Sequence, residues 1–244
     1  MKIGSFIIHL ERAVERIPQV NHLIETLPFD ARVVAATDGT QMSAAEQASY
    51  QPRLLRPHYP FRLRPGEVAT FHSHRTCWQE IIASGLDAAL IVEDDVQLHD
   101  PLFSRALETA MAHLAQGDLV RLPYKLREKP FVVLSEGDGI RLMEPRLIGL
   151  GTQAQIVTRE AATRLLSQTE RFDRPVDTFM QLQWAHGVRV LAVWPSGVSE
   201  ISSHLGGSQI GRRKSISEKL RREILRPIYR FRLARRAAME MRGR

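Results

Sequence analysis

Hydrophobic and polar positions follow two alternating patterns in the first half of the chain. Short, mainly apolar runs, typical of buried strands in a parallel sheet, occupy residues 4–9, 32–36 and 89–92. Between them, residues 13–27 and 67–84 carry apolar side chains at helical spacing. Strands that alternate with helices in this way predict an α/β fold with a doubly wound, mostly parallel sheet.

The pattern changes in the second half of the chain. Asp100 and Pro101 predict the start of a helix, with the acid as N-cap and proline at the first helical position. Residues 131–134 and 140–143, joined by Glu-Gly-Asp-Gly, predict a mid-chain β-hairpin. The remaining predicted elements are strands at 118–122, 153–157 and 188–193 and helices at 160–167 and 178–186.

Composition and charge divide the chain into a body and a tail. The 244 residues, 43% hydrophobic and 25% charged, predict one α/β domain over 1–210 with an appendage at 211–244. The tail carries 13 Lys or Arg and three Asp or Glu, a net of +10; since the chain totals +7, the body carries −3. Cys77 is the single cysteine, which excludes an internal disulfide. No apolar run reaches the roughly 18 residues that cross a bilayer.

The tail has the pattern of a basic amphipathic helix. Apolar residues fall on one side at helical spacing among arginines, and Pro227 is expected to kink or interrupt the helix. Such a helix predicts contact with an anionic membrane surface. The first apolar positions are Leu220, Ile224, Leu225 and Ile228.

Three consecutive acids, Glu93, Asp94 and Asp95, follow the apolar run at 89–92. Ligands of open α/β sheets bind at the carboxyl ends of such strands. Three adjacent carboxylates repel one another and lose hydration, so a cation is needed to compensate them. A divalent ion suits this position, because it takes oxygen ligands from carboxylates and from substrate phosphates together. For the tripeptide alone, a solvated acidic turn is the alternative.

A group of charged residues lies where the first strand meets the next helix. His9, Leu10, Glu11 and Arg12 end the strand, and Arg16 follows one turn later. Such a junction offers backbone N–H and guanidinium groups to a nucleotide. The alternative is a solvated helix face.

Ser73 and His74 lie within the helix predicted at 67–84. His72 and His74 point about 200° apart on a helix, so they cannot hold one metal ion from one face. Ser73 lacks the sharp turn that exposes a nucleophilic serine. We therefore expect Ser73 and His74 only to reach the carboxyl edge of the sheet.

Three later segments join polar groups to loops. Gly151 and Thr152 precede a strand, and glycine there allows the backbone to approach a ligand closely. Asp177 stands at the edge of the helix predicted from Thr178, where it either caps the helix or takes part in chemistry. The polar loop that contains His204 either grips a diphosphate or links the body to the tail.

Taken in this order and at this spacing, the segments resemble glycosyltransferase family 25, which includes bacterial lipopolysaccharide and lipooligosaccharide enzymes and eukaryotic collagen galactosyltransferases. The resemblance covers residues 3 to about 213. The chain departs from the family pattern at His9, where Asn is usual, at Thr70, where Cys is common, and at Gln155, where an aromatic residue often stands. The matching residues are Ile8 to Arg12 with Arg16, Gly66-Glu67 with Ser73-His74, Ile91 to Asp95, Gly151-Thr152 with Arg159 and Ala161-Ala162, Pro175 to Asp177, and Ser208 with Ile210.

The resemblance implies a GT-A-like fold and an inverting transfer of a hexose, galactose or glucose, from a UDP-sugar. It implies Mn²⁺ or Mg²⁺ bound by Asp95, with Glu93 on the ion or on the ribose, and His204 as a third ligand or a phosphate contact. Its motif makes Asp177 the candidate catalytic base. The implied donor-binding residues are Leu10, Arg12, Arg16, Ser73, His74, Glu93, Asp94, Gly151 and Thr152.

The implied acceptor is a lipid-linked oligosaccharide of lipopolysaccharide or lipooligosaccharide. We accordingly expect a cytoplasmic protein held on the inner face of the cytoplasmic membrane by its tail. A nucleotidyltransferase is one rival, against which the lack of a Gly-rich phosphate loop with a lysine argues. The other is a non-catalytic nucleic-acid-binding protein, which leaves residues 93–95 without a purpose because acids repel phosphates. No specific nucleic-acid partner is expected.

Overall fold

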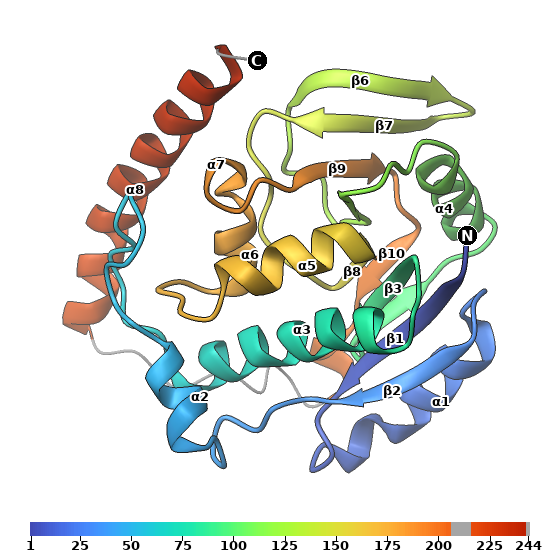
Figure 1. Ribbon diagram of the computed structural model, residues 1–244, viewed down its shortest axis with the longest axis horizontal. Coiled ribbons are helices and arrows are strands. Elements are labelled where there is room, and N and C mark those ends of the chain that lie inside the picture. The colour runs from blue at the N-terminus through green and yellow to red at the C-terminus, as the bar shows by residue number, and fades with distance from the viewer. Residues whose placement is uncertain (206–215, 243–244) are drawn as a thin grey trace.

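The structure of this chain, a computed structural model, describes residues 1–205 and 216–242. An eight-stranded sheet crosses the molecule in the order β2-β1-β3-β8-β5-β9-β7-β6, and helices cover both of its faces (Figure 1). A separate pair of short strands, β4 (Val96–Leu98) and β10 (Val198–Glu200), lies beside it. The strands of the large sheet are β1 (Ile3–His9), β2 (Ala31–Ala35), β3 (Ala88–Glu93), β5 (Asp118–Arg121), β6 (Pro130–Gly137), β7 (Ile140–Pro145), β8 (Ala154–Thr158) and β9 (Arg189–Trp194).

Six of these eight strands run in one direction, and β7 and β8 run in the other. Strands β6 and β7 form the predicted hairpin at one edge of the sheet. The predicted α/β class, with a mostly parallel sheet and a mid-chain hairpin, is therefore confirmed. The short strands β4 and β10 and the helix α2 (Ala44–Ser49) were not predicted.

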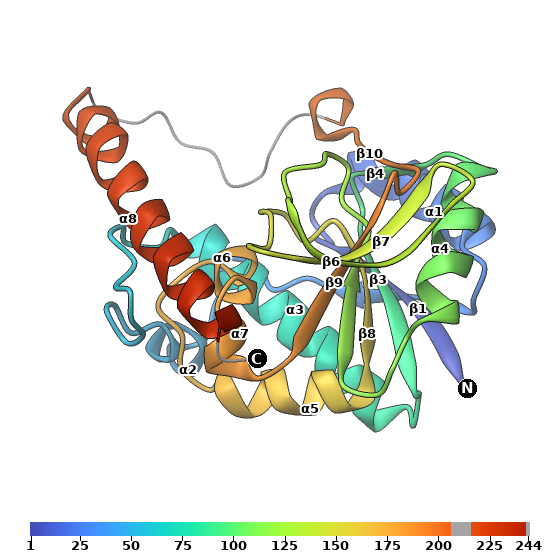
Figure 2. The same ribbon diagram turned by 90° about the horizontal axis from the view of Figure 1, so that it is seen from above.

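The core lies on both faces of the sheet. Helices α1 (Ile17–Thr26) and α4 (Leu102–Ala112) cover one face. Helices α3 (Pro65–Ala83), α5 (Arg159–Gln168) and α6 (Val176–Met180) cover the other. The short helix α7 (Gln183–His186) and α8 (Ile216–Arg242) complete the described fold (Figure 2).

Strand β3 is buried on both sides, which explains its continuous apolar run. Leu90 and Val92 enter the core beneath α1 and α4, whereas Ala89 and Ile91 enter the core beneath α3 and α5. All four side chains are inaccessible to water. Polar chemistry can therefore begin only where the strand ends, at Glu93.

Two helix starts differ from the prediction. The helix predicted at 178–186 is divided into α6 and α7, and α6 already begins at Val176. The N-cap of α4 is Pro101 rather than Asp100. The Asp100 carboxylate instead accepts hydrogen bonds from the backbone N–H, at 3.2 Å, and the hydroxyl, at 2.7 Å, of Ser104. It thus binds an N-terminal donor of α4 from outside the cap position.

The basic tail forms the long helix α8, which continues through Pro227 and packs against the body (Figures 1 and 2). Tyr229 and Leu233 are buried in a cluster with Leu182 at the start of α7. The Tyr229 hydroxyl accepts a hydrogen bond of 2.9 Å from Nη1 of Arg174, a fully buried side chain. No described helix of the chain is both long and apolar enough to span a bilayer.

Candidate active site

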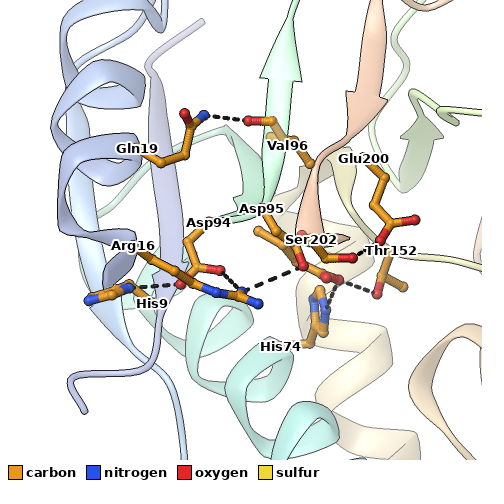
Figure 3. A network of polar contacts seen from close by, with 11 residues as sticks. His9, Arg16, Gln19, His74, Asp94, Asp95, Val96, Thr152, Glu200 and Ser202 are labelled. Carbon is orange, nitrogen blue, oxygen red and sulfur yellow. Dashed lines mark hydrogen bonds and ion pairs between the residues drawn. The ribbon is translucent and has the colours of Figure 1, made fainter. Parts of the chain in front are cut away.

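The turn that follows β3 brings its acids into one polar network with residues of four other segments (Figure 3). Strand β3 pairs with β1 so that Glu93 lies opposite Ile8, and the Asp94 N–H donates to the Ile8 carbonyl. The ends of β1 and β3 therefore meet at the same edge of the sheet, as the sequence predicted. His9 and Arg16 approach this edge from the β1 side.

Asp94 is the structural member of the acidic tripeptide. Its Oδ2 accepts a hydrogen bond of 2.7 Å from His9 Nδ1, and its Oδ1 accepts one of 2.5 Å from Arg16 Nη1. All three side chains are buried. Because both carboxylate oxygens are occupied, Asp94 fixes Arg16 beside the site, and the unusual His9 is explained by this bond.

Asp95 is a buried carboxylate in an unfavourable electrostatic environment. Burial, reinforced by the neighbouring charge of Glu93, raises the pKa of Asp95 to about 7, although Arg16 lies 3.5 Å from Oδ2. Its Oδ1 is buried, and it finds no hydrogen-bond partner in the described part of the chain. A buried carboxylate oxygen without a donor is unfavourable unless an ion compensates it.

Glu93 is held in the charged form by its neighbours. Burial opposes ionisation, but contacts with His74 and the Thr152 hydroxyl outweigh it and lower the pKa of Glu93 below its usual range. Thr152 Oγ1 donates to Glu93 Oε1 at 2.8 Å, and His74 Nε2 lies 3.6 Å from the same oxygen. The Gln155 amide donates to His74 Nδ1 at 3.2 Å, which leaves Nε2 to carry the proton that faces Glu93.

The loop from Gly149 to Thr152 connects Glu93 with Asp177. While Thr152 binds Glu93, the neighbouring Gly151 N–H donates to Asp177 Oδ2 at 3.2 Å. Asp177 lies in the first turn of α6, whose N-cap is Pro175, so Asp177 does not cap the helix. The structure therefore excludes the capping alternative, and the Asp177 carboxylate instead accepts a hydrogen bond from the Gly149–Thr152 loop.

A buried ion pair supports the same loop from behind. Arg121 binds Glu128, and its Nη2 donates to the Gly151 carbonyl at 2.8 Å. Glu128 Oε1 accepts from the Gly149 N–H at 3.1 Å. A Cβ atom at Gly149 would lie 2.6 Å from that oxygen, and Gly151 has a φ of +104°, so both positions require glycine. Sequence reasoning missed Arg121 and Glu128, which no local pattern distinguishes.

Glu93, Gly151 and Asp177 line a cavity of about 1000 Å³. Its opposite wall is formed by α8, including Tyr229 and Leu233. This volume is sufficient for a saccharide or a nucleotide, since ligand cavities range from roughly 300 to 1000 Å³.

The other predicted site residues do not all join this cavity. Arg12 is half exposed and binds Asp38 at 2.6 Å, and Leu10 lies in the same β1–α1 connection. Ser73 accepts a hydrogen bond from the Thr37 N–H at 3.0 Å, which holds the chain after β2. The unusual Thr70 does line the cavity, and its hydroxyl donates to the Gly66 carbonyl of its own helix. The side chain of His204, and the residues Ser208 and Ile210, lie outside what the structure describes.

The carboxylates fit a divalent ion only in part. Across the described residues, no group of three His, Cys, Asp or Glu side chains is placed to hold a metal ion. Asp95 offers the buried Oδ1 described above, and Glu93 lies two positions away with one oxygen bound to Thr152. Mg²⁺ commonly takes only one or two protein carboxylates and completes its shell with water and substrate phosphates.

Residues 2–180 match the family described as Glycosyltransferase family 25 (LPS biosynthesis protein). The chain belongs to glycosyltransferase family 25. This match covers the acidic turn, the Gly149–Thr152 loop and Asp177, and it confirms the resemblance found in the sequence.

Relatives in family 25 include proteins named as active and as inactive. The chain is 29% identical over 191 residues to the "Probable inactive glycosyltransferase 25 family member 3" of Rattus norvegicus, a match that covers 73% of this chain and 32% of that protein. It is 29% identical over 119 residues to "Procollagen galactosyltransferase 1" of Danio rerio, covering 47% of this chain and 19% of that protein. This chain thus spans about a third, or less, of the length of these relatives.

One similar solved structure is a Drosophila galactosyltransferase 7 mutant in complex with manganese, UDP-Gal and xylobiose. It is 9% identical with a TM-score of 0.44, and the match covers 90% of this chain and 79% of that one.

Proposed function

We propose that this chain is an inverting hexosyltransferase with a GT-A-like fold that moves galactose or glucose from a UDP-sugar to a saccharide of lipopolysaccharide or lipooligosaccharide. The observation that carries the proposal is the link made by two adjacent residues: Gly151 binds Asp177 while Thr152 binds Glu93. Glu93, the first of the three consecutive acids, and the separate carboxylate of Asp177 thereby border one cavity. Inverting transfer needs this division, because the leaving phosphate and the attacking hydroxyl stand on opposite sides of the sugar.

In this proposal the acidic turn serves the donor. Asp95 and Glu93 would hold Mn²⁺ or Mg²⁺, which when bound supplies positive charge to the leaving diphosphate. Arg16, held by Asp94, adds a fixed guanidinium beside Asp95. His74 is fully buried and contacts Glu93, so it orients that carboxylate rather than touching the donor.

Asp177 serves the acceptor in the same proposal. Its Oδ2 is fixed by the Gly151 N–H, and its Oδ1 lies 3.2 Å from the Thr178 hydroxyl. Within the cavity, this carboxylate takes the proton from the acceptor hydroxyl as that hydroxyl attacks the anomeric carbon. Because the Gly151 N–H donates to Oδ2 and the Thr178 hydroxyl donates to Oδ1, the carboxylate is held in a defined direction, which is what base catalysis requires, and its remaining lone pairs can take the proton.

The deciding experiment measures transfer from a panel of UDP-sugars with Mn²⁺, with Mg²⁺ and with chelator, for wild type and three variants. Asp177→Asn should lower kcat by about 100-fold or more while metal-dependent UDP binding is retained. Asp95→Asn should abolish that binding. Asp87→Asn, directly before β3 and at the end of that strand remote from Glu93, is the control and should change neither. If Asp177→Asn loses UDP binding and keeps its turnover at saturation, the two roles are wrongly assigned.

We also propose that α8 carries the protein on the anionic, cytoplasmic face of the membrane where a lipid-linked acceptor resides. The support is a stripe of exposed apolar side chains on its outward face: Ile224, Ile228, Phe231 and Met239 are 57%, 43%, 70% and 57% exposed. Exposed arginines, among them Arg235, accompany the stripe. Apolar side chains flanked by arginine suit the lipid headgroup region.

Sedimentation with liposomes tests the membrane proposal. Binding should require anionic lipid and weaken with salt, because surface attraction is screened within about 10 Å at 0.1 M. Phe231→Ser should weaken it, whereas Val33→Ser, at another exposed apolar position, on β2, should not. Equal binding by wild type and Phe231→Ser would place the membrane contact on another surface.

A further inference from the structure

The cavity beside Asp177 has a strongly cationic wall. Among the residues that the structure describes, six Lys or Arg side chains line it, against three carboxylates, Glu67, Glu93 and Asp177. The cations come from two parts of the chain that are distant in sequence. One part comprises the segments directly before and after the β6–β7 hairpin, and the other is the inward face of α8. They are Arg127, Lys129, Arg146, Arg222, Arg226 and Arg230.

Five of these cations, all but Arg222, have no ion pair with a carboxylate among the residues that the structure describes. Arg127 and Arg146 donate to neutral groups, the Tyr124 hydroxyl at 2.9 Å and the Pro130 carbonyl at 3.2 Å. Positive side chains gathered around a concave surface attract an anion more strongly than the same charges spread over an open surface.

The three carboxylates that line the cavity accept hydrogen bonds from other groups. Glu67 accepts a hydrogen bond of 2.8 Å from the Arg64 N–H at the start of α3. Glu93 is bound by Thr152, and Asp177 by Gly151. Each of the three thus already accepts a hydrogen bond from another part of the fold, and the described lining of the cavity carries more cations than carboxylates.

The position of the cationic wall separates it from the donor residues. Arg16 and Asp95, which serve the donor in the function proposed above, are not among the described residues that line the cavity. The cavity meets the donor region only along Glu93, Gly151 and Thr152. A group that contacts α8 therefore lies on the acceptor side of Asp177.

We propose that α8 and the β6–β7 hairpin form a phosphate subsite, so that the acceptor of this enzyme is a phosphorylated saccharide. The inference rests on the function proposed above and names the class of its acceptor. Arg226 and Arg230 stand one helical turn apart, so both guanidinium groups can reach one phosphate. Arginine suits this task because its planar group donates two parallel hydrogen bonds to phosphate oxygens.

Calorimetry without donor tests the subsite by itself. The probes are glucose 6-phosphate and glucose, which differ in the phosphate alone. Wild type should bind glucose 6-phosphate, and glucose at least tenfold more weakly. Arg226→Gln and Arg230→Gln should each weaken glucose 6-phosphate binding by about tenfold while leaving metal-dependent UDP binding unchanged. Arg235→Gln, on the outward face of the same helix, is the matched control and should keep wild-type affinity.

Two outcomes would overturn the phosphate subsite. The first is that glucose 6-phosphate binds no more tightly than glucose, or that Arg235→Gln loses as much affinity as Arg226→Gln. The second is that Arg226→Gln and Arg230→Gln weaken UDP binding instead, which would assign these cations to the donor diphosphate. Failure of the proposed transferase reaction is a separate result: it appears as absent turnover with every UDP-sugar and leaves the donor-free calorimetry unaffected.

Discussion

The attachment of α8 to the body can be tested at one hydrogen bond. Arg174 is fully buried, and four of its five described hydrogen bonds go to Asp173, Leu55 and Pro57. The fifth, from Nη1 to the Tyr229 hydroxyl at 2.9 Å, connects it to α8. Tyr229→Phe removes this acceptor but keeps the ring.

A hydrogen bond to a charged group contributes about 1.5 to 3 kcal/mol, so we expect Tyr229→Phe to lower the free energy of unfolding by about 2 kcal/mol. At roughly 2 to 4 °C per kcal/mol for a chain of this size, the melting temperature should fall by about 4 to 8 °C. Equilibrium unfolding in urea, supported by calorimetry, measures both quantities.

Tyr59→Phe is the matched control for this experiment. The Tyr59 ring packs edge to face on Tyr229 with 5.4 Å between centroids, and its hydroxyl has no described hydrogen bond. Its loss should therefore stay within about 0.5 kcal/mol, the usual range for changes away from buried contacts. If Tyr229→Phe is as stable as wild type, or if both variants lose equally, the bond to Arg174 does not hold α8, and the reasoning fails.

Three further predictions concern other buried groups. Burial lowers the pKa of His186 to about 4 from 6.5, so the stability it contributes is present above pH 6.5 and is lost as pH falls toward 4. The free energy of unfolding measured in urea should fall by up to about 3 kcal/mol as the pH falls over this interval, and His186→Gln should lack this part of the pH dependence. His74→Asn should raise the KM for the donor by about tenfold with a smaller effect on kcat, because His74 orients Glu93; an unchanged KM would contradict that role. Gly149→Ala should cost about 1 to 3 kcal/mol in thermal unfolding, because its Cβ would meet a buried carboxylate; a stability equal to wild type would show that this carboxylate can move aside.

The sheet and the acidic turn could be predicted because their signals are local. A strand buried on both faces is a continuous apolar run in the sequence, and the acids that end it mark the sheet edge. The role of Asp177 could not be settled in the same way. A carboxylate at a helix start has the same sequence pattern whether or not it caps the helix, and the contact with Gly151 joins positions 26 residues apart.

The face by which α8 packs was also beyond the sequence. Its spacing predicts a helix, and Ile224 and Ile228 head the apolar side. The structure leaves both of these exposed and buries Tyr229 and Leu233 instead. A helix with apolar residues on two sides has two faces that can pack, and only the shape of the body at Leu182 selects between them.

The Gly149–Thr152 loop has an entropic consequence for catalysis. Three side chains hold its four residues: Glu128 binds Gly149, Arg121 binds Leu150 and Gly151, and Glu93 binds Thr152. The segment thus loses its conformational entropy when the chain folds, and it has no further conformational entropy to lose when substrates bind. Substrates therefore meet hydrogen-bonding groups that are already in place, and any slow closing step of the catalytic cycle must belong to another part of the molecule.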